Sequence, residues 1–493
     1  MGSAAEVEGR LGWTQGLSLR AEGRALDYDL RRFMSFLNPE PFPVGVRAGG
    51  TFRAQGTLLP ELSLDCDVEL QAQDLDVTVG EGAAGDTVFA VPKARLSSRL
   101  NVGTHEIRFG TTRIETPSVA VDIPSGRILY KEGLWLDTKV TLQSLEHVRQ
   151  YLPAGLDARG TADGTLGGPY RELVFAYDLD LASAVVFGED LGRLRATARY
   201  DLHDLVLDRA VLAGPFGRLA AEGSVGLHRE GTYSLQIEAT VPALEAVAQA
   251  VRRSVPGVPA DLGGAAAASG RLTGPLASPV FAGELKMDRP AALGYALDEI
   301  ALRGEASAEG WRIAEGTARA YGAPFEARGE GDTRALQVSG TISGLHPERI
   351  AAAGGRELPV TAEFSGSFEV GGEYGNPRAE LTGTAEEVVV AGRAVGSVTA
   401  TVQYRGRLLD AQVAALEGAV RVRGELGLGN GFPFTADVEL AELPWSALAG
   451  EGVPPELTGE AVSGRGQVGG ALSGDQQGIQ ASWTGAARGV RWG

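Results

Sequence analysis

Three glycines match the spacing of a dinucleotide-binding fingerprint, in the run Gly464-x-Gly466-x-x-Gly469. In that fingerprint the glycines follow a strand and open a helix that binds the pyrophosphate, and an acidic residue lies about 20 positions further on. Here the glycines fall in a cluster that recurs along the chain, so we interpret them as turn glycines. The sequence contains no Gly-x-Ser-x-Gly elbow and no phosphate-binding loop. We therefore predict no cofactor.

Three pairs of carboxylates have the spacing i, i+2, which places both acids of a pair on one face of a strand. Two acids placed in this way could bind a cation or act as general acid and general base. Each pair falls on the polar side of an alternating segment, where a solvated outer face is the simpler interpretation. The pairs are Asp65 and Asp67, Asp178 and Asp180, and Asp437 and Glu439.

The histidines and the single cysteine form no metal-binding pattern. Cys66 is in register with Leu64 and Val68, so we interpret it as a small apolar residue on a sheet face rather than a reactive thiol. The histidines are scattered, with no His-x-x-x-His or comparable spacing, at His105, His147, His203, His228 and His346. We predict no metal site and no enzymatic activity.

The composition excludes several classes of protein. Of 493 residues 70 are Gly, 43% are hydrophobic and only 6% are aromatic, so the chain can bury aliphatic surface but has few large side chains. No strict Gly-X-Y period supports a collagen, and no apolar run reaches the length of about 18 residues that a membrane span requires. The net charge of −18 leaves no basic surplus to neutralise phosphates, so we expect no nucleic-acid partner.

A diverged repeat organises the chain. Glycine clusters recur around Gly56, Gly164, Gly270, Gly366 and Gly466, at spacings of 108, 106, 96 and 100 residues. These positions divide the chain into a partial repeat with a short helix, four repeat units and a truncated unit, with boundaries at 1–56, 57–164, 165–270, 271–366, 367–466 and 467–493.

Between the glycine clusters, apolar and polar residues alternate, which predicts strands with one apolar and one solvated face. Over residues 62–79 the apolar positions switch from even to odd numbers, which predicts a β-bulge near Gln73 and Asp74. The side chains that we expect to line the apolar face are Leu173, Phe175, Tyr177, Leu179, Leu181, Tyr233, Leu235, Ile237, Val398, Val402, Val438 and Leu440.

Each repeat is expected to carry one short, proline-bounded helix before its glycine cluster. The five segments lie at residues 26–37, 145–152, 242–251, 347–353 and 444–449.

The sequence thus predicts an all-β fold, with roughly 40 strands at about one per ten residues. At about 4.8 Å between strands, one sheet would be on the order of 190 Å long, and open sheets of more than about ten strands curl or close. Two architectures remain: a solenoid with a filled core, or an elongated, repetitive antiparallel sheet curled into a hydrophobic, taco-like trough.

The unit Gly-x-Leu-x-Gly-Pro, together with alternating strands and a short helix, resembles the repeats of the TamB branch of the AsmA-like proteins. Residues 268–279, Ala-Ser-Gly-Arg-Leu-Thr-Gly-Pro-Leu-Ala-Ser-Pro, carry the resemblance best, followed by residues 164–169. In that family the sheet forms a long trough lined with hydrophobic side chains. The trough bridges the Gram-negative inner and outer membranes and is implicated in phospholipid movement and in outer-membrane protein assembly and secretion.

The resemblance implies a non-catalytic, periplasmic repeat region of a translocation and assembly module, in a parent protein anchored in the inner membrane. Its implied partners are phospholipid acyl chains in the groove and an outer-membrane assembly partner bound through regions absent here. We expect the chain to be a fragment of that repeat region. The alternative is a structural β-solenoid scaffold or surface adhesin with a filled core. A polysaccharide-active enzyme would need a carboxylate or aromatic cluster that we do not find.

Overall fold

The computed structural model describes fifteen stretches of the chain. They are residues 5–13, 16–29, 31, 44–79, 86–145, 156–186, 188–228, 230–252, 261–292, 295–353, 360–390, 392–428, 433–448, 457–471 and 479–492. The chain divides into two compact units. Unit 1 comprises residues 1–257 and 268–279, and unit 2 comprises residues 258–267 and 280–493.

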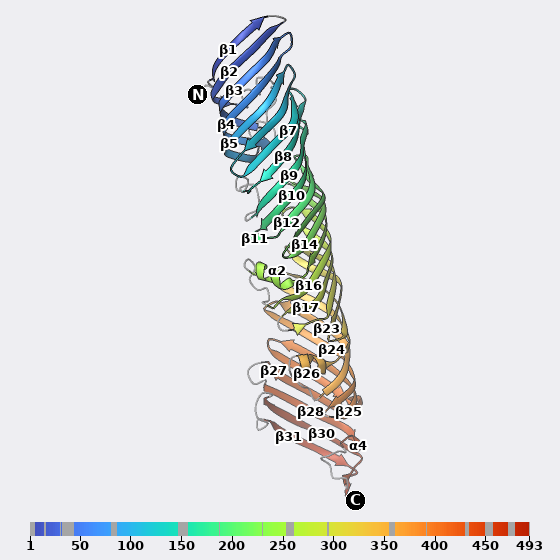
Figure 1. Cartoon of the computed structure of the whole chain (residues 1–493). Coiled ribbons are helices and arrows are strands. Elements are labelled where there is room, and N and C mark those ends of the chain that lie inside the picture. The colour runs from blue at the N-terminus through green and yellow to red at the C-terminus, as the bar shows by residue number, and fades with distance from the viewer. Residues whose placement is uncertain are drawn as a thin grey trace. The chain divides into compact units, whose positions relative to one another are not determined.

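Unit 1 is an antiparallel sheet whose long strands pair with their neighbours in chain order (Figure 1). Its elements are β1 (Ala5–Trp13), β2 (Leu17–Asp29), β3 (Val44–Leu59), β4 (Ser63–Val79), β5 (Asp86–Gly103), β6 (Glu106–Glu115), β7 (Val119–Leu129), β8 (Gly133–Leu142), β9 (Leu156–Pro169), β10 (Val174–Val186), β11 (Glu189–Asp190), β12 (Arg193–Tyr200), β13 (Asp204–Gly214), β14 (Gly217–Gly226), β15 (Thr232–Val241) and α2 (Leu244–Val251).

Unit 2 follows the same plan, and β16 (Gly263–Pro275) contributes residues to both units. Its other elements are β17 (Val280–Ala292), β18 (Tyr295–Ala296), β19 (Glu299–Ser307), β20 (Gly310–Ala320), β21 (Ala323–Asp332), β22 (Ala335–Leu345), α3 (Pro347–Ala353), β23 (Val360–Glu373), β24 (Asn376–Val390), β25 (Arg393–Arg405), β26 (Leu408–Ala415), the 3-10 turn η3 (Leu416–Gly418), β27 (Val420–Gly427), β28 (Pro433–Pro444), α4 (Trp445–Leu448), β29 (Leu457–Thr458), β30 (Ala461–Ala471), β31 (Gln480–Arg488) and β32 (Arg491–Trp492). β29 pairs only with β32.

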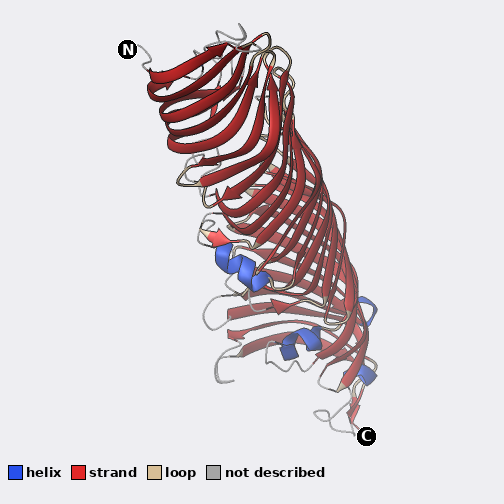
Figure 2. Cartoon of the chain, turned by 45° about the horizontal axis from the view of Figure 1, so that its top comes forward, coloured by secondary structure: helices blue, strands red, loops and turns tan. Residues whose placement is uncertain are grey.

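Strands make up 80% of the described chain (Figure 2), so the predicted all-β, antiparallel class is confirmed. The alternation of apolar and polar residues explains why these segments form strands. Along β21 the side chains from Phe325 to Glu330 switch at every residue between half-buried and exposed, with Phe325 on one face and Glu326 on the other. Period two is the side-chain period of a strand, so one face collects the apolar residues and the other collects the charges.

The glycines that mark the repeats lie inside strands, and not in turns. Gly56, Gly164, Gly270, Gly366 and Gly466 belong to β3, β9, β16, β23 and β30. The interpretation of the fingerprint glycines as turn glycines is therefore wrong, because Gly464, Gly466 and Gly469 all pair with β31. At several of these positions the backbone of the neighbouring strand lies too close to leave room for a side chain. A Cβ on Gly164 would lie 2.0 Å from the carbonyl oxygen of Ala176 on β10.

The predicted bulge in β4 is confirmed. Arg47 on β3 pairs with Gln73, whereas Gly45 pairs with Asp76, so β4 has one extra residue here, and Asp74 has a φ of 51°. The same irregularity recurs in the strands that follow two other glycine strands, β9 and β23. In β10 the register shifts between Leu181 and Ser183, and in β24 the extra residue falls between Glu386 and Val389, where Glu387 has a φ of 52°. The bulge is thus a feature of the repeat.

Three of the expected helices are present as α2, α3 and α4, and α3 has the expected bounds 347–353. The expected helix at 26–37 is wrong over residues 26–29, because β2 continues to Asp29 and pairs there with β3. Pairing with a neighbouring strand overrides the helical spacing of the apolar residues. The rest of that segment from residue 32, and residues 146–152 of the second one, lie outside the described residues. Six strands, β23 to β28, separate α3 from α4, and an even number of antiparallel strands returns the chain to the same margin.

The close approach of the β10 backbone to Gly164 leads to a testable prediction. Gly164→Ala should lower the free energy of unfolding by about 1–3 kcal/mol, because the added methyl overpacks the β9–β10 pair. Gly371→Ala, in the corresponding strand β23, is the matched control, since its Cβ would lie 3.6 Å from the nearest atom. Urea unfolding of both variants checks this. Equal stability of the two variants would show that the close approach carries no energetic weight.

Candidate functional site

In unit 1, cross-strand register joins apolar residues of neighbouring strands into rows on one face. One such row passes without a break from β4 to β15. Its members are Cys66, Leu100, Phe109, Gly126, Leu136, Leu166, Phe175, Tyr200, Leu205, Val225 and Tyr233. Every member is apolar, aromatic or glycine, so a single face of this sheet is apolar along its length.

The residues that the sequence predicted to line this face fall into the same set of rows. In unit 1, Phe175, Tyr177, Leu179 and Leu181 alternate along β10, and their rows lead through β12, β13 and β14 to β15. Three of these rows reach β15 at residues that the sequence also predicted. The row of Phe175 reaches Tyr233, the row of Tyr177 reaches Leu235, and the row of Leu179 reaches Ile237. In unit 2, the register similarly joins Val398 to Leu440, and places Val402 and Val438 on the same face.

Two of the predicted residues are buried: Leu235 on β15, which is 9% exposed, and Leu173, which belongs to a packed cluster. Leu173 precedes β10 and is only 6% exposed, beside Ile128 and Leu134. Phe175 packs against this cluster, and its ring lies 5.9 Å from that of Tyr200. The cluster occupies the margin of unit 1 where the β7–β8, β9–β10 and β12–β13 turns lie, which we name the hairpin margin. At this margin the apolar face is filled by its own side chains.

Tyrosine hydroxyls join successive hairpins at their turns. Tyr130 follows β7 and donates to the carbonyl oxygen of Gly103 at the end of β5, at 3.0 Å. Tyr170 follows β9 and donates to that of Leu129 at the end of β7, at 3.1 Å. In unit 2, Tyr374 follows β23 and donates to the carbonyl oxygen of Asp332 at the end of β21, at 3.1 Å. Each hydroxyl thereby fixes one hairpin to the one before it.

Burial perturbs the phenols on the apolar face. Partial burial, with a smaller contribution from Tyr130, raises the pKa of Tyr170 to about 12. Burial also raises the pKa of Tyr177, whose hydroxyl forms a 2.7 Å hydrogen bond with that of Thr138. Burial and then the charges of Asp65 and Asp67 raise the pKa of Cys66, so this thiol stays protonated at neutral pH, as expected for a small apolar-face residue.

The opposite face carries the charges, and the three predicted carboxylate pairs lie there with cross-strand partners. Asp67 pairs with Arg99 at 3.4 Å, and Asp65 accepts a 2.9 Å hydrogen bond from Asn101. Arg193 donates to Asp180 at 2.6 Å and thereby lowers the pKa of that carboxyl. The remaining acids have the same kind of partner: Thr197 for Asp178, Gln467 for Asp437 and Arg465 for Glu439.

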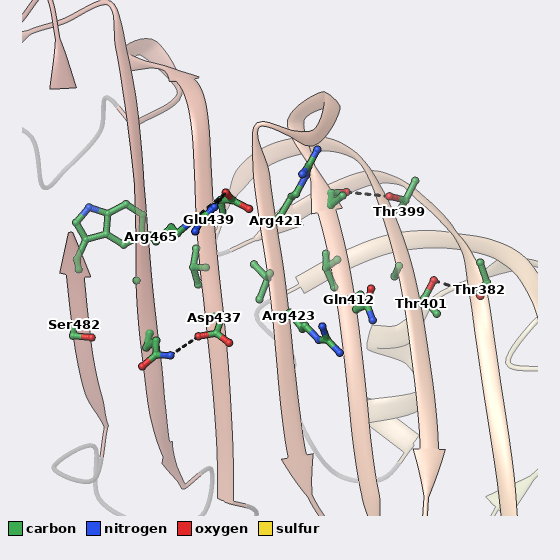
Figure 3. A pocket seen from close by; sticks show the side chains of 18 of the residues that line it. Thr382, Thr399, Thr401, Gln412, Arg421, Arg423, Asp437, Glu439, Arg465 and Ser482 are labelled. Carbon is green, nitrogen blue, oxygen red and sulfur yellow. Dashed lines mark hydrogen bonds and ion pairs between the residues drawn. The ribbon is translucent and has the colours of Figure 1, made fainter. Parts of the chain in front are cut away.

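A cavity of about 1000 Å³ lies against strands β24 to β28, β30 and β31 of unit 2 and is lined by residues of both faces (Figure 3). Two cross-strand rows, one on each side of it, run from β24 to β31. Sequence analysis missed this cavity, because only cross-strand register brings these strands' side chains into rows. Of its lining residues, the sequence had singled out Asp437, Val438, Glu439 and Gly466. The rows are Thr384, Thr399, Ala414, Arg421, Glu439, Arg465 and Thr484, and Thr382, Thr401, Gln412, Arg423, Asp437, Gln467 and Ser482.

No protein-family model and no curated protein matches the chain. In the described ranges, no three side chains of His, Cys, Asp or Glu come together in a way that would hold a metal ion. None of the helices in the described part of the chain has the length and hydropathy that crossing a bilayer requires. The function is therefore inferred from the geometry of the two faces.

The tyrosine bond at the hairpin margin can be tested by pH. Tyr170→Phe should lower the free energy of unfolding by about 1 kcal/mol at neutral pH, because the carbonyl of Leu129 loses its donor. The folded pKa of Tyr170, about 12, lies above the ordinary value of 10.0, so its contribution is complete below pH 10 and declines as the pH rises towards 12. Urea unfolding across this range should show a shallower decline in the variant than in the wild type.

Tyr321→Phe is the matched control, since among the described residues no hydrogen bond involves the Tyr321 hydroxyl. An equal loss of stability in Tyr170→Phe and Tyr321→Phe would contradict the role given to the Tyr170 bond.

Proposed function

We propose that the chain is a non-catalytic lipid-binding region that holds phospholipid acyl chains against the apolar face of a curled sheet. In the parent protein, this region would act in the manner of TamB-like proteins. It would bridge the inner and outer membranes, with roles in phospholipid transport and in outer-membrane protein assembly and secretion. The observation that carries the proposal is the continuity of the apolar rows away from the hairpin margin, exemplified by the row from Leu181 through Leu194 and Leu212 to Leu219.

The amount of exposed surface supports a lipid-holding face over a filled core. The accessible surface of the chain is 30606 Å², whereas a compact monomer of 51.4 kDa exposes about 17,000 Å². Buried apolar residues in the described part are mostly alanines, and Thr112 is the largest fully buried side chain. A solenoid scaffold or adhesin with a filled core would instead bury its leucines and phenylalanines completely.

An apolar face that is open to water needs an occupant, since large apolar patches otherwise promote aggregation. An acyl chain is a suitable occupant because it needs only apolar contact. Polar side chains on this face include pairs that are hydrogen-bonded to each other, Ser98 with Thr112 at 2.5 Å and Thr138 with Tyr177 at 2.7 Å. The head group would stay in water beyond the margin of the sheet.

The proposed location is the periplasm, in a parent protein anchored in the inner membrane, with an outer-membrane assembly partner bound by other regions of that protein. The support for this part is the order of the elements alone. Bulged second strands follow the glycine strands β3, β9 and β23, and the helix α3 precedes β23, which is the order that the resemblance to TamB-like repeats implies.

Mass spectrometry of organic extracts of the purified chain tests the proposal. We expect co-purifying phospholipid, and we expect Val402→Glu to lose most of it, because the carboxylate would interrupt the apolar row on β25. Thr382→Glu, on the polar face of the adjacent β24, is the matched control and should keep its lipid. Circular dichroism would confirm that both variants fold. A lipid-free extract of the folded wild-type chain would overturn the proposal.

A further inference from the structure

Neighbouring rows on the apolar face of unit 1 differ in side-chain size. One row, from β9 to β14, consists mostly of alanines, namely Ala162, Leu179, Ala196, Ala210 and Ala221. We name it the alanine row. The next row towards the margin where α2 follows β15 contains Leu142, Gly160, Leu181, Leu194, Leu212 and Leu219, and we name it the leucine row.

On its other side the alanine row is bordered by a row of mixed size. The large residues Tyr177 on β10, Leu207 on β13 and Leu235 on β15 alternate there with Ala198 on β12 and Gly223 on β14. Successive residues on one face of a strand are about 6.6–6.8 Å apart along the strand. A row of methyl groups between the leucine row and the large side chains of Tyr177, Leu207 and Leu235 therefore forms the floor of a furrow about as wide as one extended alkyl chain.

Unit 2 has the same profile on its own apolar face. There a row of small residues, Ala411, Gly424 and Ala436, crosses β26, β27 and β28. The larger residues Leu409, Leu426 and Phe434 border it on one side, and Val413, Val422 and Val438 border it on the other. The recurrence of a row of small residues between larger side chains in both units indicates that the furrow is part of the repeat.

We infer that a phospholipid acyl chain binds along the alanine row of unit 1, with the leucine row as its outer wall, and that Ala210 at the floor determines whether the chain fits. This inference rests on the proposed function and assigns the lipid to one part of the apolar face. The hairpin margin is not available for binding, because Ile128, Leu134 and Leu173 already pack together there. The leucine row is less covered, and Leu219 is 39% exposed.

The furrow fits an acyl chain better than a protein segment. A peptide strand that docks on a sheet forms main-chain hydrogen bonds at a strand edge, whereas this furrow crosses the strands over backbone groups that the sheet ladder already pairs. Its floor and walls on β12, β13 and β14 offer only methyl and isobutyl groups, of Ala196, Ala210, Ala221 and the neighbouring leucines. Such a lining contributes through buried apolar area and makes no demand for polar groups on the occupant.

The experiment compares two alanines of β13 that receive the same substitution. Ala210→Phe fills the furrow, and Ala213→Phe places the same ring on the exposed opposite face, where Ala213 pairs with Arg193 and Arg218. Binding of a phosphatidylglycerol with one fluorescent acyl chain is measured on the full, delipidated chain. We expect Ala210→Phe to weaken binding at least tenfold and Ala213→Phe to bind as the wild type does. Wild-type binding by Ala210→Phe would overturn the inference while leaving the proposed function standing.

A second measurement covers the case in which Ala210→Phe does not fold. A photo-crosslinking benzoylphenylalanine replaces either Leu212 in the leucine row or Leu136 at the hairpin margin. We expect the labelled lipid to crosslink at least fivefold more at Leu212. Equal crosslinking at the two positions would overturn the placement in the furrow. If the folded wild-type chain binds no phospholipid, the proposed function fails, and the inference fails with it.

Discussion

Cross-strand register is the constraint on which the rest of this protein depends. Each strand has two faces, and a slip of one residue would exchange them, moving Phe175 to the charged face and Asp178 to the apolar one. The register is held by pairing on both sides of each strand, as when Leu179 lies opposite Ala162 on β9 and opposite Ala196 on β12. Large side chains are seldom fully buried in the described residues. The ladder of backbone hydrogen bonds therefore provides much of the structural specificity that a packed core provides in globular proteins.

The register also explains the glycines and the bulges. Where two strands approach closely, as at Gly164, a side chain would collide with the neighbouring backbone, so the repeat keeps a glycine there. The bulge that follows in the second strand adds one residue and increases the local twist, which a long antiparallel sheet needs if it is not to be flat. The tyrosines at the turns then fix one hairpin to another, so curvature and register are set by a small number of recurring residues.

Much of the fold was predictable because its information is local. Alternation along β10 placed Phe175 and Leu181 on one face, and proline marked α3 at its observed bounds. The change of parity along β4 located the bulge at Asp74. The segment at Leu26 was misjudged as helical because its spacing fits a helix, and only its pairing with β3 makes it a strand.

Features that depend on several strands at once were not predictable from one sequence. Tyr170 has no local signal for its bond to Leu129, 41 positions away. The alanine row likewise joins Ala162 to Ala221 only after the register of the intervening strands is known. The two rows that border the cavity of unit 2 arise in the same way. The alternation of apolar and polar residues thus predicted which residues share a face, but not which rows consist of large or of small side chains.

The account rests on the claim that the apolar face is accessible from water rather than sealed in a core. Alkylation of Leu181→Cys in a Cys66→Ser chain, by a small water-soluble maleimide after removal of lipid, measures this directly. An accessible face predicts a rate in the folded chain within about tenfold of the rate in denaturant, while Leu134→Cys in the packed cluster reacts far more slowly. A rate at Leu181→Cys slowed by about 10³ or more, as global unfolding would impose on a sealed core, would contradict the account.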